Sequence, residues 1–248
     1  MLKPAPAWIA ERPIAHRALH DKDAGCAENS FAAFDAAIQA GYAIECDLQV
    51  SYTGEPVVFH DPVLGRMTGI SGKVRDHAPE ALSAMKLLGT NDGIYTLSHH
   101  LKQVDGKVPL ILELKGIKDE DSGFVEGVTR ALRSYDGQVA VMSFDHRLCA
   151  QFAELLPDIP RGLTAEGGDD TYETHLQAMH DYDLQFVSYD VNELPVRFVE
   201  EMRALDLPVI TWTVRNAEQI AATYTHADQM TFEDFLPENS LNRTRYGS

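Results

Sequence analysis

A (β/α)8 TIM barrel with an added β-hairpin is the fold class that the sequence predicts. The chain has 248 residues, and barrels of this kind typically need about 250. Eight strand-like runs alternate with helix-like patterns along the chain. Such alternation is typical of parallel strands joined by right-handed helical crossovers, which together close into a barrel.

The strands are recognised as short apolar runs between turn-forming residues. We expect the eight barrel strands at residues 13–16, 43–50, 109–115, 138–143, 161–164, 185–189, 208–213 and 228–232. One further run, 57–60, returns from the second strand as the arm of a β-hairpin. A turn centred on Thr53-Gly54 would place His60 opposite Asp47 across that hairpin.

Helical periodicity fills the intervals between the strands. Helices are expected at residues 30–40, 124–134, 146–156, 172–182, 195–205 and 217–225. The first should end at Gly41, and either Asn29 or Ser30 can cap its start; for Asn29, capping is the role we expect.

The longest irregular interval is 62–108, with two short helices expected at 79–88 and 97–104. We interpret this interval as a small insertion at the barrel mouth, because about 45 residues are too few for an independent core. Residues 1–248 are therefore expected to form a single domain, with a disordered polar tail at 239–248.

Composition restricts the partners and the compartment. The net charge of −17 repels nucleic acid and anionic membrane surfaces. The three cysteines, 26, 46 and 149, have no CxxC spacing, which argues against a disulfide framework or a structural zinc site. No signal-peptide-like core or run of about 20 apolar residues is present, so we expect a cytoplasmic protein without stable membrane insertion. The oligomeric state is not predicted.

Three carboxylates fall at the ends of neighbouring strands. Strand alternation places Glu45 and Asp47 on one face of run 43–50, and Glu113 shares a face with Lys115 at the end of the next barrel strand. Barrels place their active sites at this end. An all-carboxylate set favours one hard divalent cation, Mg²⁺ or Ca²⁺, over zinc.

Two histidines also end strand-like runs. His16 follows the first barrel strand, and His60 follows the returning arm of the hairpin. An imidazole titrates near neutral pH, so such a pair can act as general acid and general base.

Several short motifs follow one another in a fixed order along almost the whole chain: His16-Arg17, Glu28-Asn29-Ser30, Glu45-x-Asp47, Val57-Val58-x-His60-Asp61, Glu113-x-Lys115, Ser143-Phe144-Asp145, Trp212-Thr213-Val214 and the strand around 228–233. This ordered set resembles the glycerophosphodiester phosphodiesterase family. The resemblance implies an enzyme that uses a divalent cation to hydrolyse small glycerophosphodiesters to sn-glycerol 3-phosphate and an alcohol.

Functional roles follow from the same resemblance, position by position. His16 and His60 match the acid/base pair; Glu45, Asp47 and Glu113 match the metal ligands; Arg17 and Lys115 match the phosphate-binding cations. Glu28 is a candidate for substrate binding or for the start of the first helix. Trp212 is a candidate for a substrate-facing wall or for barrel filling.

Two departures from the family pattern lie near these motifs. Ala18 stands where the family usually has Gly, and Ala27 stands where it usually has Pro. If position 18 needs a positive φ, alanine strains the loop by about 1 kcal/mol. Head-group preference therefore stays open. Alternative readings are a lysophospholipase D-like phosphodiesterase and a catalytically silent barrel that binds a phosphorylated ligand.

Overall fold

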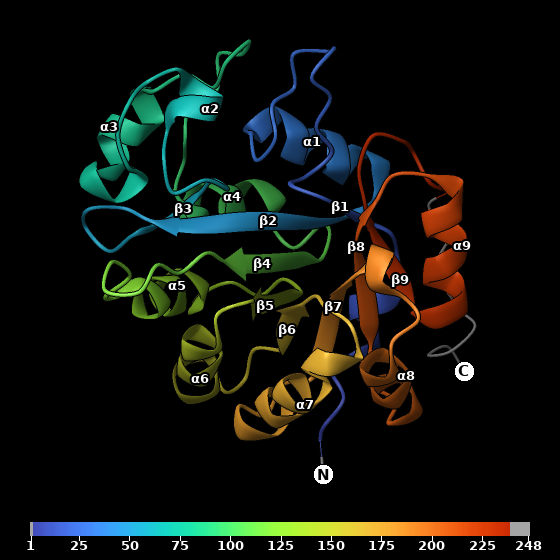
Figure 1. Ribbon diagram of the computed structural model, residues 1–248. Coiled ribbons are helices and arrows are strands. Elements are labelled where there is room, and N and C mark those ends of the chain that lie inside the picture. The colour runs from blue at the N-terminus through green and yellow to red at the C-terminus, as the bar shows by residue number, and fades with distance from the viewer. Residues whose placement is uncertain (1, 239–248) are drawn as a thin grey trace. The chain divides into compact units, whose positions relative to one another are not determined.

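The computed structural model describes residues 2–238 and has the predicted α/β TIM-barrel fold (Figure 1). Within those residues, eight parallel barrel strands alternate with helices, and one extra strand is bonded to the second barrel strand. The chain divides into two compact units, which we describe separately. The first is Arg17–Gln138, the β2–β4 unit; the second, the β5–β9 unit, holds the remaining described residues.

The β2–β4 unit is built on three strands. The barrel strand β2 (Ala43–Val50) pairs in parallel with β4 (Leu110–Leu114) and antiparallel with the extra strand β3 (Pro56–Val58). Helices α1 (Phe31–Ala40), α4 (Leu97–Val104) and α5 (Phe124–Leu132) lie alongside these strands (Figure 1). Every residue of β2 and β4 is buried, as expected for parallel strands covered on both faces.

The first helix begins and ends as its sequence directs. The Ser30 hydroxyl accepts a hydrogen bond from the Ala33 backbone N–H, so Ser30 is the N-cap of α1. Gly41 ends the helix in the left-handed conformation, with φ of +74°. The expectation that Asn29 caps this helix is wrong, because its side chain is bonded elsewhere.

The hairpin register differs by one residue from the prediction. Gln49 lies opposite Val57, and Phe59 donates its backbone N–H to the Asp47 carbonyl. Asp47 therefore faces Phe59, and the predicted pairing of Asp47 with His60 is wrong. Ser51 and Glu55 close a three-residue loop in which Gly54 has φ of +78°, whereas the prediction assumed a two-residue turn.

A separate apolar cluster supports the interval after the hairpin. This interval contains α2 (Gly65–Thr68), a 3₁₀ turn (Val74–Asp76) and α3 (Pro79–Ala84), which is shorter than the predicted 79–88. The buried members of the cluster are Ala27, Val57, Phe59, Leu64, Val74, Leu82, Leu87 and Ile94. They join the interval to β3. The assignment of 62–108 as a dependent insertion in a single domain stays a prediction.

The helix α4 completes the cover of this unit. Its His100 ring packs against Phe34 of α1 at a centroid distance of 4.2 Å. The side-chain amide of Gln103 donates to the Phe31 carbonyl and to Asp35, both on α1. The predicted bounds of this helix, 97–104, agree with the structure.

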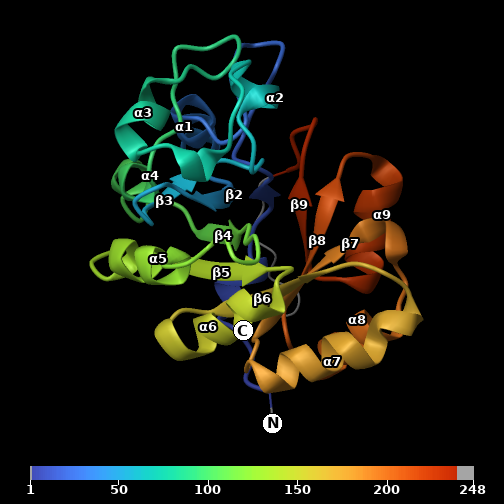
Figure 2. The same ribbon diagram turned by 60° about the vertical axis from the view of Figure 1, so that its left-hand side comes forward.

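The β5–β9 unit contains the other six barrel strands. Its strands are β1 (Ile14–Ala15), β5 (Val139–Ser143), β6 (Arg161–Ala165), β7 (Phe186–Asp190), β8 (Val209–Val214) and β9 (Gln229–Phe232). Within the unit they are parallel, in the order β1-β9-β8-β7-β6-β5. The alternating helices are α6 (His146–Leu155), α7 (Tyr172–Asp181), α8 (Arg197–Ala204) and α9 (Ala217–His226), as Figure 2 shows.

Short 3₁₀ turns complete this unit: Ala7–Ala10, Asp169–Thr171 and Val191–Glu193. No helix among residues 2–238 combines the length and the apolar character needed to cross a membrane. The expected disorder of 239–248 lies outside the described residues.

Candidate active site

The three predicted carboxylates come together in the β2–β4 unit. Glu45 and Asp47 project from the same face of β2, and Glu113 is the register partner of Asp47 on β4. Each carboxylate offers one oxygen within 4.8 Å of the others, and all three side chains are buried. Strand alternation and parallel register are therefore sufficient to build an acidic cluster that could hold a metal ion.

Burial and mutual repulsion disfavour three negative charges in this cluster. Burial, together with the charges of Asp47 and Glu113, raises the pKa of Glu45 well above its ordinary value. Burial also raises the pKa of Glu113 to about 6, although the neighbouring Lys115 lowers it in part. Without a cation, the cluster therefore binds protons more tightly than isolated carboxylates do.

Two basic side chains adjoin the cluster. Lys115 places Nζ 2.6 Å from Glu113 Oε1 and 3.2 Å from Asp47 Oδ1. Arg17 places Nη1 2.9 Å from Glu28 Oε1 and Nε 3.5 Å from Asp47 Oδ2. Burial tends to lower the pKa of both groups, but the surrounding carboxylates more than offset this, so both remain cationic.

The loop after β1 holds Glu45 through its backbone. Arg17 and Ala18 both adopt positive φ, +53° and +63°. In this conformation the Arg17 N–H donates to Glu45 Oε2 at 2.9 Å, and the Ala18 N–H donates to the Glu45 carbonyl at 3.0 Å. Position 18 is thus a site where glycine is favoured and alanine is present.

Asn29 orients a carboxylate of the cluster. Its side-chain amide donates to Asp47 Oδ2 at 2.9 Å, and its backbone has φ of +58°. Glu28, the preceding residue, is buried and forms ion pairs with Arg17 and Arg66. The Glu-Asn pair therefore fixes site residues instead of beginning the first helix.

His60 lies two residues beyond β3, and one nitrogen of its ring binds a carboxylate. Its Nδ1 is 2.7 Å from Asp61 Oδ1, and the Gln49 side chain of β2 donates to its carbonyl. An ionised carboxylate can only accept a hydrogen bond, so Nδ1 carries the proton. Nε2 is then the basic nitrogen of the neutral ring.

His16, in the β5–β9 unit, has the same kind of partner. Its Nδ1 is 2.8 Å from Glu233 Oε2, and its backbone N–H donates to the carbonyl of Phe232 at the end of β9. Arg215 places Nη2 2.7 Å from the same Glu233 oxygen. Arg66 likewise binds Asp61, the carboxylate that contacts His60. The two predicted acid/base histidines thus share one arrangement, in which a carboxylate binds Nδ1 and an arginine binds the carboxylate.

Trp212 lies on β8 of the same unit and is half-buried. Its indole N–H donates to the Ser188 carbonyl, and its ring packs edge-to-face on Phe144 at 5.4 Å between centroids. These contacts fix the ring. They are compatible with either role predicted for it.

Comparison with known proteins gives the family. The model of the glycerophosphoryl diester phosphodiesterase family matches residues 16–231. The chain belongs to this family. Hydrolysis of glycerophosphodiesters is the activity that defines it, and the chain is accordingly a phosphoric diester hydrolase. The resemblance found in the sequence is confirmed.

Individual relatives agree with this assignment. A glycerophosphodiester phosphodiesterase of Caldanaerobacter subterraneus is 27% identical over 233 residues, covering 89% of this chain and 93% of the relative. A phosphodiesterase of Oleispira antarctica, solved with its product sn-glycerol-3-phosphate, superposes with a TM-score of 0.81 at 21% identity, covering 90% and 93% of the two chains. The corresponding enzyme of Thermotoga maritima gives 0.73 at 20% identity, with coverage of 88% and 92%. The two structures confirm the barrel fold.

Three residues that contact this phosphodiesterase's predicted site residues were not assigned a role from the sequence: Asp61, Arg66 and Glu233. Arg215, which contacts Glu233, was not assigned one either. Glu233 directly follows β9, so the strand-end rule that identified His16 could have identified it. Asp61 is adjacent to His60 in the sequence. Arg66 and Arg215 carry no comparable sequence signal, because each is recognised only by the carboxylates that it contacts.

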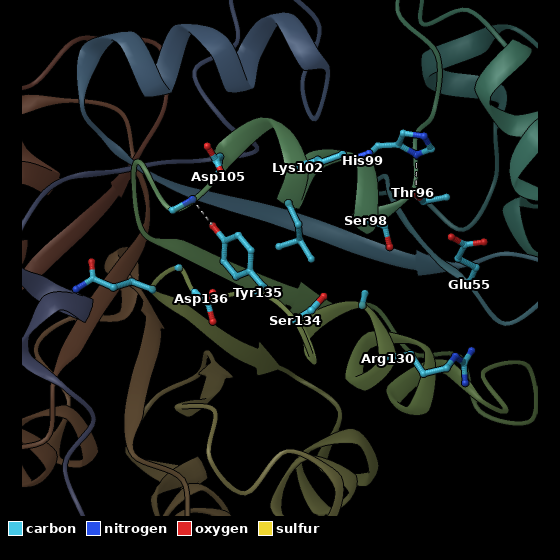
Figure 3. Close-up of a pocket in the computed structure, with 15 residues that line it drawn as sticks. Glu55, Thr96, Ser98, His99, Lys102, Asp105, Arg130, Ser134, Tyr135 and Asp136 are labelled. Carbon is cyan, nitrogen blue, oxygen red and sulfur yellow. Dashed lines mark hydrogen bonds between the residues drawn. The ribbon is translucent and has the colours of Figure 1, made fainter.

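The phosphodiesterase has a hollow within the β2–β4 unit. It has a volume of about 810 Å³ and lies between α4 on one side and α5, with the segment that follows it, on the other (Figure 3). Figure 3 shows His99 and Lys102 at one wall and Arg130 and Tyr135 at the other. Its lining includes none of the predicted site residues.

Proposed function

We propose that this enzyme cleaves glycerophosphodiesters to sn-glycerol 3-phosphate and an alcohol with the help of one divalent cation. The observation that carries the proposal is the buried group of Glu45, Asp47 and Glu113, with ligand oxygens within 4.8 Å of one another. Two cationic side chains adjoin that group. Positive charge beside an acidic cation site is what an anionic phosphodiester requires.

The donor set fits a hard cation. All three ligands are carboxylates, and oxygen-only donors favour Mg²⁺ or Ca²⁺. Glu45 Oε1 is buried and has no hydrogen-bond partner within the described part of the chain, so one acceptor of the cluster is available to a ligand. When bound, a divalent cation would neutralise negative charge that develops on the phosphate during the reaction.

Arg17 and Lys115 are the proposed phosphate-binding groups. Both stay protonated across the neutral range, because the carboxylates around them raise their pKa values. The guanidinium of Arg17 and the ammonium of Lys115 can donate hydrogen bonds to the non-bridging phosphate oxygens. These bonds stabilise the negative charge that increases as the nucleophile attacks. Glu28 holds Arg17 in place, and Trp212 is proposed to contact the substrate.

His16 and His60 are the proposed acid/base pair. The bond from phosphorus to the nucleophile forms while one imidazole accepts the nucleophile's proton. The bond from phosphorus to the alcohol oxygen breaks while the other imidazole donates a proton to that oxygen. In both rings Nδ1 is committed to a carboxylate, so proton exchange falls to Nε2.

Two nucleophiles satisfy this chemistry. Water would give the two products in one displacement. A hydroxyl of the glycerol moiety would first give a cyclic phosphate, which water then opens. Product analysis at short reaction times distinguishes the two routes, because only the second releases the alcohol before sn-glycerol 3-phosphate is formed.

A lysophospholipase D-like activity is the second candidate. The insertion exposes three apolar side chains, Val63, Ile70 and Leu88, with exposed fractions of 48%, 40% and 58%. An acyl or alkyl chain on the substrate could be covered by such side chains. This candidate predicts faster cleavage of lysophospholipids than of glycerophosphocholine.

A substrate and metal panel tests the proposal. Glycerophosphodiesters, lysophospholipids and an aryl phosphodiester would each be assayed with Mg²⁺, Ca²⁺, Mn²⁺ or EDTA. We expect release of sn-glycerol 3-phosphate with a divalent cation and none with EDTA. Undiminished activity in EDTA would contradict the metal requirement.

Single substitutions test the acid/base pair. His16→Ala and His60→Ala should each lower kcat by about 10²-fold or more, because each removes one proton-transfer group. Circular dichroism and thermal unfolding would verify that the variants fold. Full activity in either folded variant would contradict the role of that histidine.

A further inference from the structure

Arg66 binds two carboxylates at once in the β2–β4 unit. Its guanidinium places Nη2 2.6 Å and Nη1 2.9 Å from the two oxygens of Glu28. The same group places Nε 2.6 Å and Nη2 3.0 Å from the two oxygens of Asp61. Both contacts are bidentate, which is the geometry that arginine provides and lysine does not.

Each of these carboxylates holds a residue that we propose acts on the substrate. Asp61 accepts from Nδ1 of His60 at 2.7 Å. Glu28 accepts from Nη1 of Arg17 at 2.9 Å. Arg66 therefore contacts both the carboxylate that binds the proposed acid/base residue His60 and the carboxylate that binds the proposed phosphate-binding residue Arg17.

The insertion fixes the helix that carries Arg66. The Thr68 hydroxyl of α2 donates to the carbonyl of Leu64, the residue before the helix, and the Leu64 N–H donates to the carbonyl of Gly72, beyond its end. Leu64 is itself buried in the apolar cluster that joins the insertion to β3. The position of the guanidinium is thus set by packed side chains, although the Arg66 side chain remains 44% exposed.

Electrostatics favours the charged form of all three groups. Burial tends to raise the pKa of Glu28, but Arg66 and Arg17 more than offset this, and the pKa lies below its ordinary value. Burial likewise opposes ionisation of Asp61, while Arg66 and His60 lower its pKa overall. The hydrogen bonds from Arg66 to these carboxylates raise its own pKa.

We propose that Arg66 is a positioning residue through which the insertion orients His60, by way of Asp61, and Arg17, by way of Glu28. This inference rests on the proposed function of those two residues. Loss of the guanidinium would leave Asp61 free to rotate and the buried Glu28 with one cation fewer. The first change affects proton transfer and therefore kcat; the second affects phosphate binding and therefore KM.

Steady-state kinetics of three variants test whether Arg66 positions these residues. Arg66→Gln should lower kcat by about 10-fold and raise KM several-fold, within the range that loss of an orienting contact produces. Arg66→Lys should recover only part of kcat, since an ammonium cannot make two bidentate contacts. Lys86→Gln is the matched control, because it removes an exposed cation of the same insertion that contacts the Asn91 carbonyl. An Arg66→Gln enzyme with kcat and KM within twofold of the wild type would overturn the proposal.

Double variants show whether Arg66 acts through its two carboxylates. If it acts on His60 by way of Asp61, adding Arg66→Gln to Asp61→Asn should change kcat by less than twofold. If it acts on Arg17 by way of Glu28, adding Arg66→Gln to Glu28→Gln should leave KM nearly unchanged. Effects that multiply in both pairs would contradict positioning through these groups.

A spectroscopic measurement separates this inference from the proposed function. The ¹⁵N chemical shifts of the His60 ring report which nitrogen carries the proton, whether or not the enzyme turns over. We expect a protonated Nδ1 in the wild type and in Lys86→Gln, and a mixture of tautomers in Arg66→Gln. If the ¹⁵N chemical shifts of the His60 ring in Arg66→Gln equalled those of the wild type, orientation of His60 by Arg66 would be refuted. An inactive wild type would contradict only the proposed function.

Discussion

At the scale of single residues, Ala18 shows a conflict between backbone and side chain. Its φ of +63° costs an alanine about 1 kcal/mol, but its methyl group is buried, and burial of one such group contributes about 0.8 kcal/mol. Removal of the methyl group should therefore relieve strain and lose packing in nearly equal amounts.

Ala18→Gly is accordingly expected to change the free energy of unfolding by less than about 0.5 kcal/mol. The matched control is Ala33→Gly, which removes an equally buried methyl group from a right-handed helical position of α1. The control should lose about 2 kcal/mol, because helical glycine adds its own cost of about 1 kcal/mol. Urea denaturation measures both values, and equal losses would show that position 18 is unstrained.

Glu233 binds Nδ1 of His16 and thereby helps to orient the ring. Glu233→Gln keeps the shape of the side chain but replaces an acceptor-only group by an amide, which no longer selects the Nδ1–H tautomer. We expect kcat to fall by about 10²-fold or more, with little change in KM. Steady-state kinetics on a glycerophosphodiester would measure this.

The control for this prediction is Asp234→Asn, which removes a neighbouring charge from a side chain that is 64% exposed. It should retain activity within twofold. If Glu233→Gln behaved like this control, the contact between Glu233 and His16 would have no part in the reaction.

Residue patterns predicted the acidic cluster but not the groups that hold the histidines. Alternation along β2 placed Glu45 and Asp47 on one face, and the parallel register supplied Glu113. The contacts of Arg66 with Glu28 and Asp61, in contrast, depend on how the segments that carry these three residues fold together. Such contacts leave no periodic signal in the sequence.

At the scale of secondary-structure elements, the hairpin between β2 and β3 shows what a turn signal can determine. Gly54 correctly marked the turn, since it has φ of +78°. A glycine with positive φ occurs both as the second residue of a two-residue loop and as the last residue of a three-residue loop. The sequence does not show whether the loop has two or three residues, and the two loop lengths differ by one residue in the register of the opposing strand.

This turn also explains a glycine in α5. A Cβ atom at Gly127 would lie 2.3 Å from the Gly54 carbonyl oxygen and 3.1 Å from Pro56 Cδ. Because the nearer atom belongs to the backbone, α5 could accept a larger residue only by moving away from the hairpin. The close approach of these two elements therefore requires glycine.

Gly127→Ala should lower the free energy of unfolding by about 1–3 kcal/mol, even though alanine is the better helix former. Gly65→Ala is the control, since a Cβ at that exposed position meets no atom closer than 3.9 Å. It should change stability by less than about 0.5 kcal/mol. Chemical denaturation of both variants tests the packing, and a stabilising Gly127→Ala would contradict it.

At the scale of the whole molecule, the barrel was predictable because its strands and helices alternate with local signals of their own. Predicted and observed bounds of the eight barrel strands agree within one residue. Predicted and observed bounds differ most where tertiary packing determines the end of an element. An example is α3, which ends at Ala84 instead of continuing to 88.

Two carboxylates of the acidic cluster, Glu45 and Glu113, ionise less readily than isolated carboxylates do. The pKa of Glu113 is raised to about 6 and that of Glu45 lies well above its ordinary value, chiefly through burial. Raised pKa values mean that the metal-free enzyme retains protons which a cation must displace. The apparent affinity for a divalent cation should therefore increase as the pH rises from about 5 to 7.

Calorimetric titration of the EDTA-treated, dialysed enzyme with Mn²⁺ tests this linkage. In buffers of different ionisation enthalpy, the apparent binding enthalpy should vary with the buffer near pH 6, where Glu113 is about half protonated, and vary less near pH 8. Glu113→Gln removes one titrating ligand and should release fewer protons at pH 6. Binding enthalpies that are the same in all buffers at pH 6 would show that Mn²⁺ displaces no proton and does not bind at these carboxylates.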